Sequence, residues 1–435
     1  MYFGQSWGGD FSGYIMQGMS LVEGTTDQVI EQNRFTVENS SRSFAPIAYP
    51  WGYPYLIALV YALFGIDLVV LKTINIFLYL FFLIILFRLF RERLSLVARI
   101  ALVAIFAVNP SILLYLNHIL SDILFLTLST LAVLLMDRIV IKQRVVFSRL
   151  VDHILLGAVI SGAFLVRLPG LLLLITLFCC QVIQTYIFWR RPENRQEVKI
   201  IFQFIPYLVF VGIYFLTPLA DYPGVTIANT SSIAKLWIHN FRLPVTVLLP
   251  SYIFHSNIYK LDINTLIYIL SLPFTLVGVI ANWRKDYHFI LYIGLLSALL
   301  TWFSAPALRY IFPILPFYVY FTFAGLKWLL NALPKQYIQL TKVLAYAVYL
   351  AVLLRLVFTS INYVNLVSIN GNANFDGPYS PISAEIFDFI SKNTTPESVV
   401  IFFKPRVLRM FTQRNTFTTQ ECVDLERGDY LVIHK

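Results

Sequence analysis

Long runs of apolar residues, separated by short polar segments, dominate the chain from residue 68 to residue 361. A helix that crosses a bilayer needs roughly 17 to 25 predominantly apolar residues. We therefore expect ten membrane-spanning helices, with approximate bounds 68–88, 99–116, 119–137, 150–166, 169–189, 200–218, 263–281, 287–304, 307–329 and 341–361. A shorter apolar run at 53–66 predicts a helix along the membrane interface.

The polar segments between these runs alternate in their content of Lys and Arg. One set is basic and the next is poor in basic residues, and positively charged loops favour the cytoplasm. The basic set holds Arg88, Arg91, Arg93 and Arg99, then Arg138, Lys142 and Arg144, and then Arg284 and Lys285. Residues 1–67, 219–262 and 362–435 are then extracytoplasmic. Since the chain starts outside, we expect a further transmembrane helix upstream of residue 1.

The composition agrees with a polytopic membrane protein. Hydrophobic residues make up 58% of the 435 positions, charged residues 13%, and the mean hydropathy is +0.72. A soluble protein would carry about twice that charged fraction. The sequence contains no Walker-type loop, dinucleotide fingerprint, Gly-x-Ser-x-Gly motif or Cys/His metal spacing, so we expect neither a nucleotide cofactor nor nucleic-acid binding. The three cysteines do not predict a disulfide.

The pattern changes after residue 361. A helix is expected at 382–392, a strand at 398–403, a short helix at 406–412 and a last strand in DYLVIHK. We therefore divide the chain into a first extracytoplasmic loop (1–67), a transmembrane domain (68–361) and a small α/β domain (362–435). Lys404, Arg406 and Arg409 form a basic cluster that we interpret as a solvated turn, with acceptor binding as the weaker alternative.

The first candidate for chemistry is Asp10, in SWGGDFSGYIMQGMSL. The Gly-Gly pair before it permits a sharp turn, Trp7 and Tyr14 surround it with aromatic side chains, and small residues follow at helical spacing. Most carboxylates in outer loops are simply solvated. A carboxylate at a membrane-facing cleft can instead act as a general base or orient an acceptor hydroxyl. A divalent metal ion is left open as a further ligand.

The second candidate is Asp122, in NPSILLYLNHILSDILFLTLS. It follows Ser121 at the start of a helix, where the helix dipole alone would favour a carboxylate. An ionisable group at the outer end of an apolar span is also a functional candidate. Asn117 and His118 stand close to it in sequence, and no second ligand at metal spacing accompanies the histidine.

Two arginines also fall at outer ends of spans. Arg167 lies in FLVRLPGLLLL, and Arg309 lies in SAPALRYIFPILPFY beside Tyr310. They either anchor helices at the interface or bind a lipid-linked phosphate, which fits the guanidinium fork. The segment SFAPIAYPWGYPYLIALVYALFG, with Tyr53, is either a membrane anchor or one wall of a lipid-binding cleft.

The order of these motifs resembles the GT-C superfamily of integral-membrane glycosyltransferases. An acidic residue in the first outer loop precedes YPWGYPYLIALVYALFG, RLFRERLS, NPSILLYLNHILSD, VRLPGLLLL and LRYIFPILPFY. Within that superfamily the sequence is most similar to the bacterial form of the branch that contains the dolichyl-phosphate-mannose–protein mannosyltransferases and the aminoarabinose transferases.

The resemblance implies an all-α polytopic fold. It also implies sugar transfer from a polyprenyl-phosphate donor to a lipid, glycan or protein hydroxyl at the outer face of the bacterial inner membrane. By this resemblance Asp10 is the base or acceptor-orienting residue, Asp122 is the second acidic position and Arg309 holds the donor phosphate. The family usually carries an acidic pair in the first loop, and here Phe11 follows Asp10.

Other functions remain open at the level of sequence. A transporter or flippase of lipid-linked glycans predicts inverted repeats and charges near the bilayer midplane, and neither is evident. A glycan polymerase or ligase predicts a large outer loop late in the chain. An inactive scaffold is the third alternative, because one acidic residue of the usual pair is absent.

Overall fold

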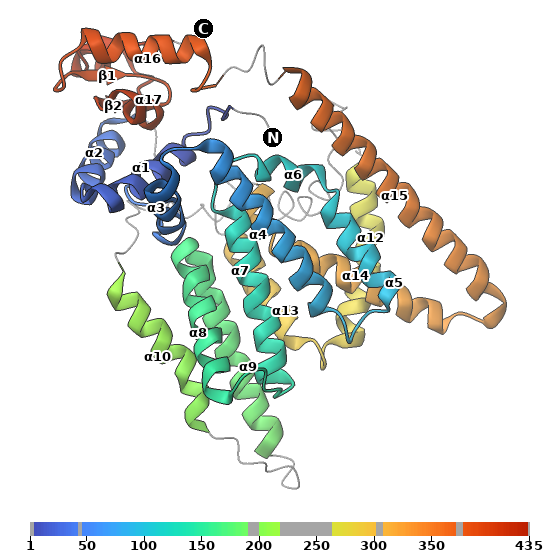
Figure 1. Ribbon diagram of the computed structural model, residues 1–435. Coiled ribbons are helices and arrows are strands. Elements are labelled where there is room, and N and C mark those ends of the chain that lie inside the picture. The colour runs from blue at the N-terminus through green and yellow to red at the C-terminus, as the bar shows by residue number, and fades with distance from the viewer. Residues whose placement is uncertain are drawn as a thin grey trace.

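The computed structural model describes residues 4–41, 46–189, 200–217, 263–301, 308–370 and 377–433. It is a helical bundle that carries a small group of helices and strands at one end (Figure 1). Three helices precede the first long apolar segment: α1 (Asp10–Glu23), α2 (Thr26–Asn39) and α3 (Gly52–Phe64). The last of these occupies the region where the sequence predicts an interfacial helix.

Helices occupy all ten regions where spans are predicted. They are α4 (Leu68–Leu89), the pair α5 (Leu96–Ala107) and α6 (Pro110–Leu116), α7 (Asp122–Leu135), α8 (Arg149–Val166), α9 (Leu171–Trp189), α10 (Ile200–Leu216), α12 (Ile263–Asn282), α13 (Tyr287–Thr301), α14 (Leu315–Ala332) and α15 (Lys335–Asn370). A π-helical turn, Met136–Ile141, continues α7. The loop predicted at 219–262 lies outside the described residues.

The bend within the second predicted span has a local cause. The axes of α5 and α6 differ by 55° across their junction. Pro110 stands at the start of α6, where its missing N–H costs nothing, and the side chain of Asn109 accepts a hydrogen bond from Ile112 N at 3.1 Å. An Asn cap followed by Pro starts a new helix rather than continuing the old one.

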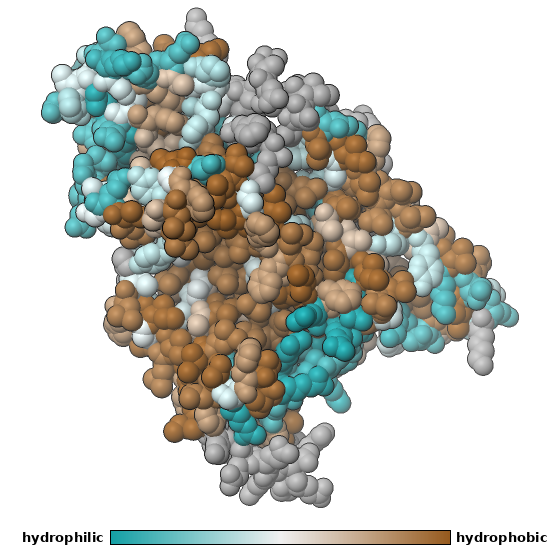
Figure 2. All heavy atoms as spheres, viewed as in Figure 1, coloured by the Kyte–Doolittle hydropathy of each residue, from teal (hydrophilic) through white to brown (hydrophobic). Residues whose placement is uncertain are grey.

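Five helices of the described residues are long and apolar enough to cross a membrane, and the bent pair makes a sixth. Four shorter apolar helices accompany them at α3, α10, α12 and α13. Large apolar side chains such as Phe77, Phe204 and Phe215 are exposed around the bundle. Figure 2 shows the result as a broad hydrophobic region between a hydrophilic cap at one end and hydrophilic patches at the other. The chain is an integral membrane protein.

The end of the bundle opposite the cap contains a buried ionic network. Arg93 donates from Nε to Asp286 at 2.6 Å and from Nη2 to Asp137 at 2.6 Å. Tyr320 donates to the other oxygen of Asp286 at 2.5 Å, and His288 Nε2 lies 3.2 Å from Asp137. The network therefore joins the α4–α5 connection to the turn that continues α7, to the start of α13 and to Tyr320 within α14.

The C-terminal segment folds as a three-stranded parallel sheet with two helices. Its elements are α16 (Pro381–Asn393), β1 (Val399–Ile401), α17 (Pro405–Thr412), β2 (Asn415–Phe417) and β3 (Tyr430–Leu431), and the strand order is β2-β1-β3. The helix–strand alternation predicted from the sequence is present. Apolar residues of α16, β1 and α17 share one core with residues of α1, α3 and the start of α4.

One prediction for this segment is wrong. Arg406 and Arg409 do not lie in a solvated turn, because both side chains are buried where α17 packs against α1 and α2. Arg409 donates to Gln32 O and to the side chains of Asn33 and Thr36 in α2. A buried guanidinium requires several acceptors, and helix α2 supplies them.

Candidate active site

Helix α1 places Asp10 at the capped end of the bundle. Asp10 is the first residue of this helix, where the unsatisfied backbone N–H groups favour a carboxylate. Two residues of α1 then fix the segment that faces it. Gln17 binds both the backbone N and O of Tyr49, at 2.8 and 3.1 Å. A Cβ on Gly13 would lie only 2.5 Å from the Tyr49 ring, so glycine permits this close approach.

Asp10 is bound by residues that lie far from it in the sequence. Its Oδ1 accepts a hydrogen bond from the Tyr49 hydroxyl at 2.9 Å, and its Oδ2 accepts one from Arg309 Nη2 at 2.6 Å. The side chain of Asp10 nevertheless remains 37% exposed, against 18% for Arg309. The carboxylate is thus held in place while one face stays accessible to a ligand.

Asp122 lies deeper, at the first residue of α7, and its side chain is only 1% exposed. Arg167 Nη1 lies 2.8 Å from its Oδ1, and Arg309 Nη1 lies 3.7 Å from its Oδ2. Arg167 is the residue at which α8 ends, in an extended conformation before the Leu-Pro-Gly turn. We call Asp10, Asp122, Arg167 and Arg309 the ion-pair cluster.

Tyr310 joins the two arginines of this cluster. The Arg167 and Arg309 guanidinium carbons lie 5.0 and 5.5 Å from the centre of its ring, within the range of cation–π attraction. Arg167 Nε also donates to Ser121 Oγ at 3.2 Å, and the Tyr14 hydroxyl lies 2.9 Å from the same oxygen. Tyr14, Tyr310 and both arginines, which the sequence proposes separately, therefore meet at one place.

The other predicted residues lie outside the ion-pair cluster and have contacts of their own. The Tyr53 ring packs edge-on against Tyr14, with 5.1 Å between centroids. His118 Nε2 lies 3.3 Å from Ser6 Oγ, and Asn117 Oδ1 is buried without a hydrogen-bond partner among the described residues. Trp7 packs instead against the C-terminal segment, where its ring centroid lies 5.1 Å from that of Phe403.

Two residues of this region, Tyr49 and Lys72, were not singled out from the sequence, and a third, Arg406, was assigned to a solvated turn. Tyr49 has no distinguishing local pattern. Arg406, from the basic cluster, donates from Nη1 to the Tyr49 hydroxyl at 3.1 Å. Lys72, near the start of α4, is fully buried and donates to Gly4 O. Its signal was present, since a lysine inside the apolar run LVVLKTINIF is a functional candidate by default.

The surroundings set the charge states of the site. Burial would raise the pKa of Asp10, but the charge and hydrogen bond of Arg309, with the Tyr49 hydroxyl and the Arg406 charge, hold that pKa below its ordinary value. Burial and the adjacent Asp10 carboxylate raise the pKa of Tyr49 well above its usual range. Burial, with the charges of Lys72 and Arg309, lowers the pKa of His118 to about 4. At neutral pH Asp10 is ionised, and Tyr49 and His118 are neutral.

The residues of this site do not fit a bound divalent metal ion. Both carboxylates of the ion-pair cluster face guanidinium groups, which repel a cation. Across the described residues no three His, Cys, Asp or Glu side chains are placed to hold a metal. We therefore assign no chemical step to a metal.

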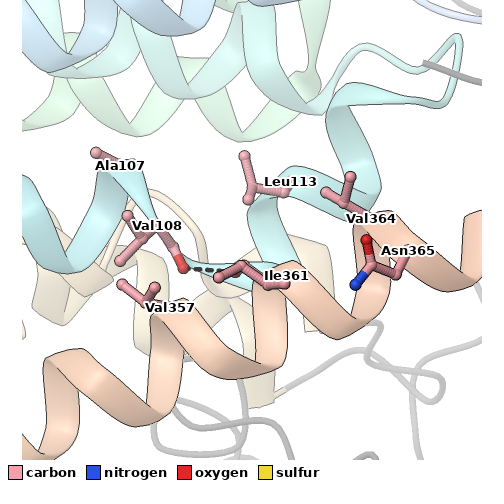
Figure 3. Close-up of a pocket in the computed structure, with 8 residues that line it drawn as sticks. Ala107, Val108, Leu113, Val357, Ile361, Val364 and Asn365 are labelled. Atoms are coloured by element: carbon pink, nitrogen blue, oxygen red, sulfur yellow. Dashed lines mark hydrogen bonds between the residues drawn. The ribbon is translucent and has the colours of Figure 1, made fainter. Parts of the chain in front are cut away.

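A separate groove lies where α5 and α6 bend against α15 (Figure 3). It has a volume of about 250 Å³ and is lined by apolar side chains, together with Ser360 and Asn365. Ser360 Oγ donates to Val108 O at 2.8 Å across its floor, which ties α15 to the end of α5. None of its lining residues belongs to the ion-pair cluster.

The comparisons with known proteins concern the fold. Residues 48–219 match the dolichyl-phosphate-mannose-protein mannosyltransferase family. The fold is also similar to that of ArnT from Cupriavidus metallidurans in the apo state, with a TM-score of 0.52 and 13% sequence identity. That match covers 98% of this chain and 84% of ArnT. The protein has the GT-C fold.

Two further structures share the GT-C fold. ArnT from Cupriavidus metallidurans bound to undecaprenyl phosphate matches over the same shares of the two chains, with a TM-score of 0.52 and 13% identity. The archaeal oligosaccharyltransferase AglB from Archaeoglobus fulgidus, in complex with an inhibitory peptide and a dolichol-phosphate, gives 0.55 and 9% identity over 95% of this chain and 60% of AglB. No curated protein matches the chain in sequence. The resemblance drawn from the sequence motifs is confirmed.

Proposed function

We propose that this GT-C protein transfers a sugar from a polyprenyl-phosphate donor to a hydroxyl of a lipid, glycan or protein acceptor, at the extracytoplasmic face of the bacterial cell membrane. The observation that carries the proposal is the accessible Asp10 carboxylate paired with Arg309 at 2.6 Å. The family match and the lipid phosphates in the names of the similar structures support the donor class.

Arg309 is the residue that we assign to the donor phosphate. Its Nε is buried and has no hydrogen-bond partner among the described residues, and a buried donor of this kind needs an acceptor. A phosphate oxygen could displace the Asp10 carboxylate from Nη2 and also accept from Nε, in the bidentate geometry that suits guanidinium groups. Donor binding would then release Asp10 for catalysis.

Asp122 and Arg167 prepare the site for that exchange. Asp122 is too deeply buried to reach an acceptor, so we assign it to orienting the two guanidinium groups rather than to proton transfer. With Asp122 neutralising one cation, Arg167 and Tyr310 supply the positive charge and the rigid surface on which the departing phosphate is stabilised. Lys72 adds a further positive charge nearby.

Asp10 is the base in the proposed reaction. The acceptor oxygen bonds to C1 of the sugar as the bond from C1 to the phosphate oxygen breaks. The bonding electron pair leaves with the polyprenyl phosphate, and the acceptor proton moves to Asp10. In a transition state of oxocarbenium character the attacking hydroxyl has become acidic, so a carboxylate can accept its proton. The phosphate leaves as an anion and needs no proton.

The remaining predicted residues line the acceptor side. Trp7 belongs to the segment that precedes Asp10, and His118 contacts Ser6 of the same segment at 3.3 Å. Both are candidates for contact with the acceptor or the sugar. Tyr14 and Tyr53 are buried and would shape the wall of a lipid-binding cleft. We assign neither the identity of the sugar nor that of the acceptor, because no residue described above selects one.

The test uses protein reconstituted in bilayers with undecaprenyl-phosphate sugars labelled in the sugar, and native membranes as the source of acceptor. Asp10→Asn should lower transfer by at least about 100-fold, the lower range for loss of a general base, while undecaprenyl phosphate still binds. Asp27→Asn, on the exposed face of α2, removes the same charge and should leave transfer unchanged. A fully active Asp10→Asn enzyme overturns the proposal, and movement of intact donor across the bilayer without release of undecaprenyl phosphate indicates a flippase.

A further inference from the structure

The C-terminal segment reaches Asp10 through two side chains. Arg406, in the first turn of α17, donates from Nη2 to Pro46 O and from Nη1 to the Tyr49 hydroxyl at 3.1 Å. The same hydroxyl donates to Asp10 Oδ1 at 2.9 Å. A continuous path of hydrogen bonds therefore joins residue 406 to residue 10.

The direction of these hydrogen bonds is fixed by chemistry. A guanidinium group only donates, and a tyrosine hydroxyl has one hydrogen. Because Arg406 donates to the oxygen of Tyr49, the single hydrogen of that hydroxyl is directed toward the remaining acceptor, Asp10. Without Arg406 the hydroxyl could rotate and accept a hydrogen bond instead, which would leave Oδ1 of Asp10 without its donor.

The packing around Tyr49 leaves little freedom for any other arrangement. Its ring lies between α1 and α17, with 4.3 Å to the Tyr14 ring centroid and 5.6 Å to the Arg406 guanidinium carbon. Gln17 holds its backbone on both sides. Arg406 itself is 3% exposed, so its charge acts on Asp10 with little screening by water.

We propose that Arg406 is a positioning residue of the transferase site, which acts through Tyr49 to hold Asp10 in the orientation and charge state that proton transfer requires. The C-terminal segment then completes the active site rather than standing beside it. This inference rests on the proposed function, because it needs Asp10 to be the base.

Arg409, one turn further along α17, provides the internal comparison. It is equally buried, but its hydrogen bonds go to Gln32, Asn33 and Thr36 of α2 and none of them leads to Asp10. Both arginines attach α17 to the first extracytoplasmic segment, yet only Arg406 touches Tyr49. Loss of either should weaken the attachment, whereas only loss of Arg406 should change the chemistry of Asp10.

The consequence for catalysis is a change in pH dependence. The groups that act on Asp10 are Arg309 before α14, Tyr49 before α3, Arg406 on α17, Asp122 of α7 across Arg309, and Tyr14 on α1 through Tyr49. Burial raises the pKa of Asp10, and the Arg406 charge and the hydrogen bond from Tyr49 lower it. Without these two contributions the pKa of Asp10 rises. The rate, which requires ionised Asp10, then begins to fall at a higher pH than in the parent.

The experiment measures transfer from labelled undecaprenyl-phosphate sugars between pH 4.5 and 8, as the ratio of variant to parent rate at each pH. This ratio cancels the titration of the donor phosphate. Arg406→Gln should reduce kcat by about 10-fold at neutral pH, less than the roughly 100-fold expected for loss of the base itself, and by more as the pH falls. Affinity for undecaprenyl phosphate should stay the same, because Arg406 contacts Tyr49 and Pro46 and not Arg167 or Arg309. Arg406→Lys should recover part of the rate.

Two matched variants separate positioning from structure. Lys404→Gln removes a neighbouring charge whose side chain makes no hydrogen bond within the described residues, and it should behave as the parent. Arg409→Gln should lower the thermal unfolding temperature and leave the rate ratio independent of pH. If Arg406→Gln fails to fold, Tyr49→Phe tests the same link, since it keeps the ring and should reproduce the pH-dependent loss.

The inference is overturned if Arg406→Gln or Tyr49→Phe shows a pH-independent ratio like that of Arg409→Gln. That result, with Asp10→Asn inactive, leaves the proposed function intact and makes Arg406 a structural residue only. An active Asp10→Asn enzyme removes the proposed function itself.

Discussion

Arg309 Nη2 lies 2.6 Å from Asp10 Oδ2, although 299 positions separate the two residues in the chain. A second nitrogen of the same guanidinium faces Asp122 at 3.7 Å. Arg309 therefore stands between an accessible carboxylate and a buried one, and its planar fork serves both. A phosphate or carboxylate is the ligand best suited to compete with Asp10 for this fork.

Arg309→Lys tests that geometry, because it keeps the charge and removes the fork. A lysine ammonium is a point charge and cannot serve two partners in one plane. We expect binding of undecaprenyl phosphate to weaken by about 10- to 100-fold, or about 1.4 to 2.8 kcal/mol, measured by direct binding in bilayers. Arg34→Lys, on α2, is the control. Unchanged affinity in Arg309→Lys would remove Arg309 from the donor site.

Asp122→Asn should lower the stability of the fold and not only the rate of transfer. The substitution leaves Arg167 buried beside a neutral side chain, and loss of one partner of a buried ion pair costs about 3 to 5 kcal/mol. The measurement is the thermal unfolding temperature in detergent. The double variant Asp122→Asn/Arg167→Gln should recover most of the loss, since it removes the uncompensated charge. An unfolding temperature equal to the parent's in the single variant would contradict the ion pair.

Asp10 should also contribute to stability in a pH-dependent way. The folded-state pKa of Asp10 lies below its ordinary value, so folding favours the ionised form. This contribution is fully present above the ordinary pKa and is lost as the pH falls through the folded-state pKa. Between pH 6 and pH 3 the unfolding temperature of the parent should therefore fall more than that of Asp10→Asn. Parallel decreases would show that Asp10 gains nothing from its partners.

Gly13→Ala tests the support of Tyr49. The added Cβ would meet the Tyr49 ring at 2.5 Å, whereas a Cβ on Gly9 would meet nothing within 4 Å. A ring displaced by that contact no longer places its hydroxyl on Asp10. We expect Gly13→Ala to reduce transfer by about 10-fold, corresponding to about 1.4 kcal/mol, and Gly9→Ala to leave it unchanged. Equal rates in both variants would show that Tyr49 is not needed at this position.

The buried network at the opposite end of the bundle predicts an effect on stability alone. Arg93→Gln leaves the buried Asp137 and Asp286 without their shared cation, which should destabilise the fold by about 3 to 5 kcal/mol. Glu92→Gln removes an exposed charge next to it and should cost about 1 kcal/mol or less. Thermal unfolding separates the two. Undecaprenyl phosphate should bind the folded fraction of both variants as it binds the parent.

Local pattern was sufficient for most of the helices. An apolar run must form an internally hydrogen-bonded helix wherever lipid surrounds it, so the regions of α4, α7, α8 and α9 followed directly from the sequence. The Asn-Pro pair at 109–110 was visible as well, although the 55° bend that it produces depends on α6 packing in a new direction.

The charged residues of the candidate site could be predicted from the sequence, but the contacts between them could not. Asp122, Arg167 and Arg309 stood out because an ionised group at the end of an apolar span is costly without a purpose. Asp10 stood out because a Gly-Gly pair and aromatic residues surround it in the first outer loop. Which arginine faces which carboxylate followed only from the packing of α1, α7, α8 and the turn before α14. Lys72 obeyed the same rule as the others and could have been found by it.

Sequence by itself determined the number and place of the apolar helices, the alternation of helices and strands in the tail and the residues able to carry charge, because each depends on neighbours within a few positions. The tertiary structure alone decided that Arg406 is buried and reaches Tyr49, which lies 357 positions away. A basic stretch such as Lys404–Arg409 has the same polar pattern whether water or another segment satisfies its donors. Only the docking of α17 onto α1 and α2 removed the water and turned a surface charge into a support for Asp10.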